Sequence, residues 1–185
     1  ILRQAAQAVS SSLELRQVLQ LILAQLKRVI TFDTASVMLY DAEGAPDLVA
    51  GEGYVDELRT NRAAKASLKS SRILSRMAQD HQSIIIPDVR EHPDWIWVPG
   101  AERVRAFIAV PILIQDRMIG VLMMDSRQPD FYKEKDAQLA QTLAQQLAVA
   151  IQNARLFDQA QQRAREFSAL YETAHDLGTY QDLNT

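Results

Sequence analysis

The first candidates for chemistry in this chain are its three histidines, His81, His92 and His175. None of them combines with a second histidine and a carboxylate at a helical spacing that would bind a metal ion. The chain has no cysteine, which excludes a disulfide, a thiolate metal site and a catalytic thiol. Motifs for phosphate-binding loops, nucleophile elbows and zinc hydrolases are also missing from the sequence. We therefore expect neither a catalytic centre nor a metal site.

A second group of residues suits the binding of a small molecule. Arg105 opens one apolar run and Asp125 closes the next, so the two residues approach one another if the runs pair as a hairpin. They then either form an ion pair or present a guanidinium and a carboxylate to a polar ligand. Trp95 and Trp97 share the preceding loop, where they either stack on a planar ligand or pin the loop to the core. The candidate ligand-binding residues are Ser36, Met38, Tyr40, Trp95, Trp97, Arg105, Phe107, Met123 and Asp125.

These candidates depend on a hairpin at the centre of the chain. The apolar runs Ala106–Ile114 and Met118–Met124 are rich in Val, Ile and Met, which suit a buried strand. Three polar residues, Gln115 to Arg117, separate the runs and predict a hairpin loop. Pro111 has no backbone N–H to donate to the hydrogen-bond ladder of a sheet, so we expect a bulge or an edge-facing position there. Gly120 predicts a bend or the close approach of a neighbouring strand.

The remaining elements are helices and short strands, and helices occupy both ends of the chain. Strands joined in hairpins, without regular alternation of strand and helix, predict an α+β fold with a central antiparallel sheet. Three serines, Ser10 to Ser12, interrupt the first apolar pattern and predict a break between two helices. The expected elements are a short helix before Ser10, a helix over 13–30, strands over 35–40, 47–50, 64–68 and 83–86, a helix over 73–79 capped by Ser70 or Ser71, and a long helix from Lys133 to about Leu177.

The hairpin and the helix after it resemble those of GAF domains, which are small sensory modules of signalling proteins. The matching residues are Ala-Val-Pro-Ile at 109–112, Ile-Gly-Val-Leu at 119–122, Phe131, Asp136 and Ala-Ile-Gln-Asn-Ala at 150–154. The resemblance runs from about Leu13 to Phe157. It implies a GAF/PAS-like fold, in which the N- and C-terminal helices pack together on one face of the sheet and the ligand region lies on the other.

The resemblance also limits the ligand. Members that attach a bilin do so through cysteine, so a covalent chromophore is excluded here. The motif of cyclic-nucleotide binders is missing, because Asn61, Lys65 and Phe107 are not followed by Asp-Glu. Haem would need an axial ligand, for which His81 and His92 lie in suitable loops. Relatives that reduce free methionine sulfoxide use cysteines, so we expect no enzymatic activity. The cofactor, if any, is not identified by the sequence.

The long helix carries a narrow apolar stripe with 3–4 spacing and one phase slip. Such a stripe needs a partner surface. Two interpretations fit: a parallel homodimer whose helix passes a signal onward, or a linker helix that packs against a neighbouring segment. The residues of this predicted stripe are Leu143, Leu147, Ala150, Ala154, Phe157, Ala164, Phe167 and Tyr171.

The sequence predicts a domain, a linker helix and the start of a repeat. Four apolar residues near the C-terminus, Leu170, Ala174, Leu177 and Leu183, repeat the spacing of Leu2, Ala6, Val9 and Leu15. Two unrelated amphipathic helices would match equally well. We expect a GAF-like sensor domain over 1–157, a signalling helix over 158–178 and the start of a second copy over 179–185. Ile1 is not an initiator methionine, which suggests a fragment of a longer protein.

Charge and hydropathy limit the partners. The net charge of −3 gives no reason to expect nucleic acid or an anionic membrane surface. No apolar run reaches the roughly 20 residues that span a bilayer, so we expect a cytoplasmic protein. The leading hypothesis is a non-enzymatic regulatory domain of a sensor histidine kinase or diguanylate cyclase, which senses a small molecule and dimerises. The alternative is a structural dimerisation module whose pocket is filled by Met38, Phe107, Met123 and the tryptophans.

Overall fold

A computed structural model of the chain describes residues 2–41, 43–53, 67–98 and 100–182. Within those ranges, side chains are described from Leu15 to Ser168. The chain divides into one compact unit, Ile1–Ala150, and a second unit, Ile151–Thr185. The first unit holds the sheet and the cavity described below.

The first unit is built on a five-stranded sheet with the strand order β2-β1-β5-β4-β3. Every neighbouring pair of strands is antiparallel, which confirms the predicted α+β fold. The strands are β1 (Thr34–Tyr40), β2 (Pro46–Glu52), β3 (Ile84–Ile86), β4 (Ala106–Ile114) and β5 (Arg117–Ser126).

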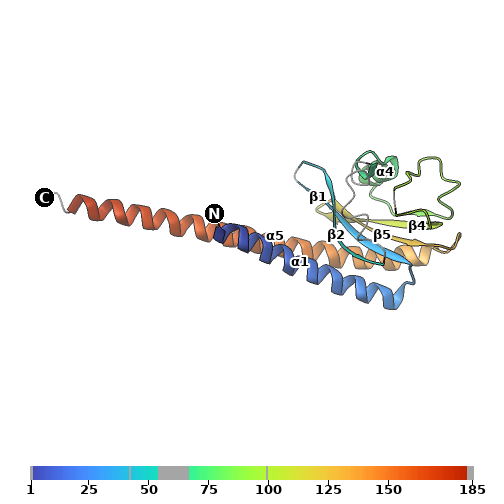
Figure 1. Cartoon of the computed structure of the whole chain (residues 1–185), viewed down its shortest axis with the longest axis horizontal. Coiled ribbons are helices and arrows are strands. Elements are labelled where there is room, and N and C mark those ends of the chain that lie inside the picture. The colour runs from blue at the N-terminus through green and yellow to red at the C-terminus, as the bar shows by residue number, and fades with distance from the viewer. Residues whose placement is uncertain (1, 42, 54–66, 99, 183–185) are drawn as a thin grey trace. The chain divides into compact units, whose positions relative to one another are not determined.

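The helices of the first unit lie on opposite faces of this sheet (Figure 1). In the described residues the main helices are α1 (Leu2–Val29), α4 (Arg72–Asp80) and α5 (Glu134–Asp182), of which α5 continues into the second unit. α1 and the beginning of α5 run along one face, and α4 covers the other (Figure 1). Successive side chains of a strand point to opposite faces, so every strand contributes to both layers. The buried residues of the terminal helices include Leu19, Leu23 and Leu26 of α1 and Ala140, Ala144 and Leu147 of α5.

The hairpin forms as predicted, but its loop is shorter. Gln115 and Asp116 have φ angles of 48° and 59°, as in a two-residue type I′ turn. Arg117 is the first residue of β5 and pairs with Ile114. The predicted three-residue loop is therefore one residue too long. A type I′ turn matches the twist of the strands and lets pairing begin at Arg117.

Pro111 and Gly120 both have the structural consequences expected of them. The β4–β5 register shifts just after Ile112, next to Pro111. β3 pairs along β4 only as far as Ala109, so β4 has a single paired neighbour at Pro111 in the described chain. A Cβ on Gly120 would collide with the carbonyl oxygen of Met38 in β1. The missing side chain therefore permits the close β1–β5 approach.

Two predicted breaks in the helices are wrong. α1 is continuous through the three serines, since residues 2–29 contain no Gly or Pro and serine lowers helix propensity only slightly. α5 passes through Gly178 and continues to Asp182, although it was expected to end near Leu177. One glycine inside a helix costs about 1 kcal/mol, which is too little to end a long helix.

The segment around α4 corrects one strand and confirms one cap. Residues 67–69 are helical, so the strand expected over 64–68 is wrong where it is described, and its first residues lie outside the described chain. The Ser71 hydroxyl accepts a hydrogen bond from the backbone N–H of Leu74, which confirms Ser71 as the N-cap of α4. His81 is the C-cap of α4, and its left-handed φ of 54° ends the helix after Asp80.

The second unit is the continuation of α5. Polar side chains one turn apart bond along it, as from Arg165 to Gln161 at 2.8 Å. None of the helices in the described residues is long and apolar enough to cross a membrane. The domain boundaries expected at 157 and 178, and the repeat over 179–185, stay predictions.

Candidate functional site

A cavity of about 100 Å³ lies in the first unit, between the sheet and the segments that cover it. Its lining residues come from the strands and from α4, so it lies on the sheet face that α4 covers. Figure 1 shows α1 and the beginning of α5 on the other face. The strands contribute Thr34, Ser36, Met38, Pro46, Leu48, Phe107, Met123 and Asp125. The cover contributes Ser67, Leu68, Ser71, Ile73 and Leu74 around α4, and Trp95, Ile96, Val98, Ala101 and Val104 from the loop before β4.

Strand register brings the floor residues together. β1 pairs with β5 so that Thr34 stands opposite Asp125 and Ser36 opposite Met123. β5 pairs in turn with β4, which places Phe107 opposite Asp125. Residues directly opposite in adjacent strands share a face. Thr34, Asp125 and Phe107 therefore form one row across three strands at one end of the cavity.

The other end of the cavity is apolar. Met38 and Leu48 of the sheet pack with Leu74 and Met77 of α4 in one buried cluster, together with Met123. Leu74 and Met77 lie on the buried face of α4, one turn apart. The cavity therefore combines apolar walls with a few polar side chains.

Trp95 joins the covering loop to the sheet. Its ring centroid lies 5.0 Å from that of Phe107 at an interplanar angle of 68°, and 6.3 Å from that of Trp97 at 81°. These are edge-to-face contacts. Trp95 lines the cavity, whereas Trp97 is 50% exposed and does not. Trp95 thus pins the loop to the sheet and lines the cavity, and its stacking on a ligand stays a prediction.

Two polar atoms of the cavity walls are buried without a partner. Thr34 Oγ1 and Trp95 Nε1 are shielded from solvent and make no hydrogen bond within the described residues. Thr34 as a whole is 2% exposed. Nearly all buried polar groups in proteins are hydrogen-bonded, so two exceptions in one cavity require a physical reason.

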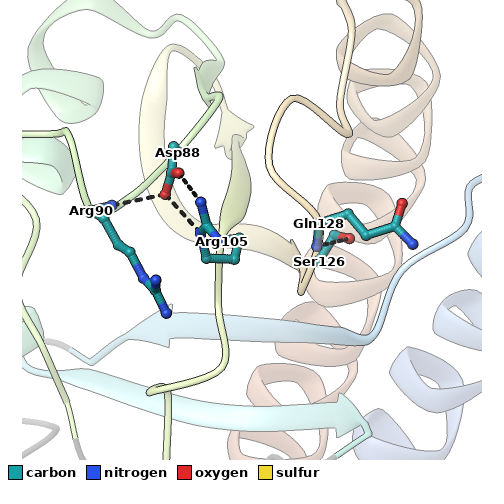
Figure 2. A network of polar contacts seen from close by, with 5 residues as sticks. All are labelled: Asp88, Arg90, Arg105, Ser126 and Gln128. Atoms are coloured by element: carbon teal, nitrogen blue, oxygen red, sulfur yellow. Dashed lines mark hydrogen bonds and ion pairs between the residues drawn. The ribbon is translucent and has the colours of Figure 1, made fainter.

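Arg105 pairs with Asp88 (Figure 2) and does not line the cavity. Its Nε donates to Asp88 Oδ1 at 3.1 Å and its Nη2 donates to Oδ2, a bidentate pair. The Arg90 backbone N–H also donates to Asp88 Oδ1 at 3.1 Å. The Arg105 hydrogen bond lowers the pKa of Asp88 to about 2, and the same contact raises the pKa of Arg105. The predicted ion pair of Arg105 with Asp125 is therefore wrong.

The correct partner of Arg105 follows from the strand register. β3 pairs with β4 so that Ile84 faces Ala109 and Ile86 faces Phe107. Continuing this register by two residues places Asp88 opposite Arg105, and the backbone N–H of Val89 donates to the Arg105 carbonyl at 2.7 Å. Asp88 and Arg105 carry opposite charges, and each lies two residues beyond the last β3–β4 pair, Ile86 with Phe107. This placement in the sequence was the signal that could have identified the pair.

Six of the nine candidate ligand-binding residues line the cavity, and three do not. Tyr40 packs against the apolar cluster, and burial raises the pKa of its hydroxyl. Trp97 and Arg105 do not line the cavity. The residues that line the cavity are Ser36, Met38, Trp95, Phe107, Met123 and Asp125. Thr34 was missed, although it lies two residues before Ser36 and therefore on the same face of β1.

The comparison with protein families decides the relationship of the chain. A family model described as the GAF domain matches residues 12–152. The chain belongs to the GAF domain family. The predicted resemblance is thereby confirmed, and it covers most of the chain.

Solved GAF domains share the fold. The GAF domain of a phosphoenolpyruvate-protein phosphotransferase from Coxiella burnetii is 24% identical, with a TM-score of 0.64 over 85% of this chain and 94% of that one. A domain of a two-component sensor histidine kinase protein from Sinorhizobium meliloti is 20% identical, with a TM-score of 0.60 over 79% of this chain and 96% of that one. A type II free methionine-R-sulfoxide reductase from Thermoplasma acidophilum is 18% identical, with a TM-score of 0.63 over 77% and 96%. At these identities the comparison establishes the fold and no shared ligand.

Proposed function

We propose that this GAF domain is a non-enzymatic regulatory module that binds a small molecule and passes the change to a larger signalling protein. The observation that carries the proposal is the cavity, which has a sheet floor, a helix-and-loop cover and two polar wall atoms without partners. A pocket of this form is the usual site for a small ligand. A sensor histidine kinase or a diguanylate cyclase remains the kind of parent protein we expect, and a cytoplasmic location stays a prediction.

The sheet supplies a physical route from the cavity to α5. Ser36 and Met123 line the cavity, whereas the adjacent residues Val37 and Leu122 are buried on the opposite face, which the terminal helices cover. A ligand that moves β1 against β5 therefore also moves the surface on which α5 rests. α5 is one helix from Glu134 to Asp182, so a shift at its beginning is passed along the helix.

A non-enzymatic role is supported by the composition of the chain. One similar structure is a free methionine-R-sulfoxide reductase, and the resemblance stated above associates that activity with cysteine. This chain has no cysteine. The cavity walls that the structure describes are mainly apolar and contain one ionisable residue, Asp125. Binding is the function that such a wall supports.

We also propose that the second unit of the chain forms a homodimer through α5. Leu147, a member of the predicted stripe, is buried in the first unit and is not available to a partner. Leu156 and Phe167 are 55% and 78% exposed. Asn153, Leu156 and Ala160 follow the 3–4 spacing of a heptad, and Phe167 lies one heptad after Ala160, with Arg163 at the position between them. The asparagine stands at a position that favours two-stranded pairing. The alternative function is a dimerisation module that needs no ligand.

Native mass spectrometry of the purified chain tests the proposed function. Mass that is lost on denaturation identifies a bound small molecule, and Ala101→Leu, which adds three carbons to the cavity wall, should abolish it. Ala78→Leu makes the same change at an exposed position of α4 and should retain it. A chain that carries no extra mass and dimerises equally well in both variants would favour the ligand-free alternative.

A further inference from the structure

One wall of the cavity belongs to neither a helix nor a strand. Residues 88–98, here called the cover loop, form turns and irregular backbone between β3 and β4. They contribute Trp95, Ile96 and Val98 to the cavity wall. Segments that are held by few contacts open at a lower free energy than helices and strands of the core. The cover loop is therefore the described part of the wall that can move without breaking a helix or the sheet.

The beginning of the cover loop is anchored to the sheet. Asp88 forms the bidentate pair with Arg105, which directly precedes β4 (Figure 2). The backbone N–H of Val89 donates to the Arg105 carbonyl at 2.7 Å. The first two residues of the loop make both contacts. Asp88 and Val89 therefore form an anchor about which the rest of the loop can turn.

Beyond the anchor, the cover loop is bonded mainly to itself. The backbone N–H of Trp95 donates to the His92 carbonyl at 3.1 Å, and that of Asp94 donates to His92 Nδ1 at 3.3 Å. The backbone N–H of Glu91 donates back to the Asp88 carbonyl at 3.2 Å. These bonds fix the shape of the loop and not its position on the sheet. The far part of the loop can therefore move as one body.

An exposed ion pair and apolar packing attach the far part of the loop to the rest of the first unit. Arg72 Nη1 of α4 lies 3.4 Å from Asp94 Oδ1, and the two side chains are 85% and 38% exposed. An ion pair this exposed contributes little to stability. Trp95 and Val98 are partly buried where they pack on an apolar cluster, and the Trp95 ring contacts Phe107 edge-to-face. The closed position of the loop therefore depends mainly on the packing of Trp95.

Two polar atoms oppose this closed position. Trp95 Nε1 is carried by the loop and Thr34 Oγ1 by the sheet, and both are shielded from solvent without a hydrogen bond in the described residues. A buried polar group that lacks a partner loses its hydrogen bonds to water without replacing them. When the loop lifts, water reaches both atoms and this penalty is removed. Apolar packing and the penalty therefore offset one another, which leaves a small free-energy difference between the closed and the open loop.

We propose that the cover loop is a lid that opens about Asp88 and Val89 and controls the access of small molecules to the cavity. This inference rests on the proposed function, because it describes how a ligand enters the same site. In the closed position the lid is the wall that carries Trp95, and in the open position the indole N–H is exposed to water.

Hydrogen exchange of the two indole N–H groups, followed by NMR in D₂O, tests the lid. Trp97 is 50% exposed, so its indole N–H is a weakly protected reference in the same molecule. The Trp95 N–H is shielded in the closed position, so its exchange rate should be proportional to the open population. We expect Trp95 to exchange more slowly than Trp97 and faster than the backbone N–H groups of β5, the central strand. Urea below the unfolding transition should speed exchange in β5 and leave Trp95 unchanged, because the opening of a loop exposes little surface.

A variant of the ion pair and its matched control provide a second test. Arg72→Gln removes the pair with Asp94 and should speed the exchange of the Trp95 indole N–H by about two- to fivefold. Arg76→Gln makes the same change one turn further along α4, where the arginine pairs with Asp80 of its own helix, and should leave the rate unchanged. Equal rates in the two variants would overturn the part of the ion pair in holding the lid.

Thr34→Val should change the rate in the opposite direction. It removes a dehydrated hydroxyl from the closed position, so the Trp95 indole N–H should exchange about fivefold more slowly or slower still. A rate that rises in this variant would overturn the argument that unpartnered polar atoms favour the open loop.

The exchange rates also separate the lid from the proposed function. If the Trp95 N–H exchanges as slowly as β5 and responds to urea in the same way, only unfolding opens the cavity and the lid is overturned. If it exchanges as fast as Trp97, the loop has no closed position and the lid is overturned as well. A lid in a chain that carries no bound mass in the native spectrum would leave the gating intact and remove the sensing function, whereas a bound molecule behind a fixed loop would do the reverse.

Discussion

Replacing Thr34 by valine should stabilise the protein. The Thr34 hydroxyl is buried and lacks a partner in the described chain, and such a group costs about 1–3 kcal/mol in proteins. Valine has nearly the same shape, suits a strand equally well and replaces the hydroxyl with an apolar methyl. We expect the free energy of unfolding to rise by about 1–2 kcal/mol, which corresponds to about 2–8 °C in Tm for a chain of this length.

Urea denaturation followed by circular dichroism measures this change. Thr34→Ser keeps the hydroxyl and loses a buried methyl, so it should lower the free energy of unfolding by about 1 kcal/mol. Thr142→Val lies on the exposed side of α5 and should stay within about 0.5 kcal/mol of the parent chain. A valine variant that is less stable than the parent would show that the hydroxyl is already satisfied, and the reasoning from an unpartnered atom would be refuted.

Three further predictions concern the ion pair, the sheet and the dimer. The pKa of Asp88 is lowered to about 2 by Arg105, so its stabilising effect is complete above an unfolded value of about 4 and is lost as the pH falls through 2. Acid titration of the unfolding free energy should therefore show Asp88→Asn and the parent converging below pH 4. Gly120→Ala should destabilise the fold by about 3 kcal/mol or more in urea, because its Cβ meets the β1 main chain, whereas Gly44→Ala meets no neighbour and should lose about 1–2 kcal/mol from its positive φ alone. Phe167→Glu should give a monomer by light scattering with an unchanged circular dichroism spectrum, because Phe167 is an exposed member of the proposed dimer seam, and a parent chain that is already monomeric would contradict the dimer.

The sheet was predictable because its strongest signals are local. The two apolar runs around Gln115 and Asp116 are long and rich in strand-forming residues, so their pairing needed no information from the rest of the chain. The helix breaks at Ser10 to Ser12 and near Leu177 were wrong for the opposite reason. Serine and a single glycine change the helical free energy by about 1 kcal/mol or less, and the rest of a long helix outweighs them.

The residues of the candidate site were predictable only where they follow from the alternation of side chains between the two faces of a single strand. Ser36 and Met38 were identified because residues two apart share a face. The partner of Arg105 was not identified, since Asp88 comes opposite it only when the short register of β3 with β4 is continued two residues beyond its last pair. Leu74 was missed for a similar reason, because its place over the sheet depends on how α4 packs and not on its own spacing.

The short length of β3 has a consequence for association between molecules. β3 covers β4 only as far as Ala109, so the remaining residues of β4 are paired on one side alone within the described chain. An uncovered strand edge can recruit a strand from another molecule and start aggregation. Pro111 lies in this stretch, where it removes a backbone donor, and the register shift after Ile112 makes the edge irregular. We therefore expect the proline that interrupts the apolar run also to keep this GAF domain from joining its sheet to that of a neighbour.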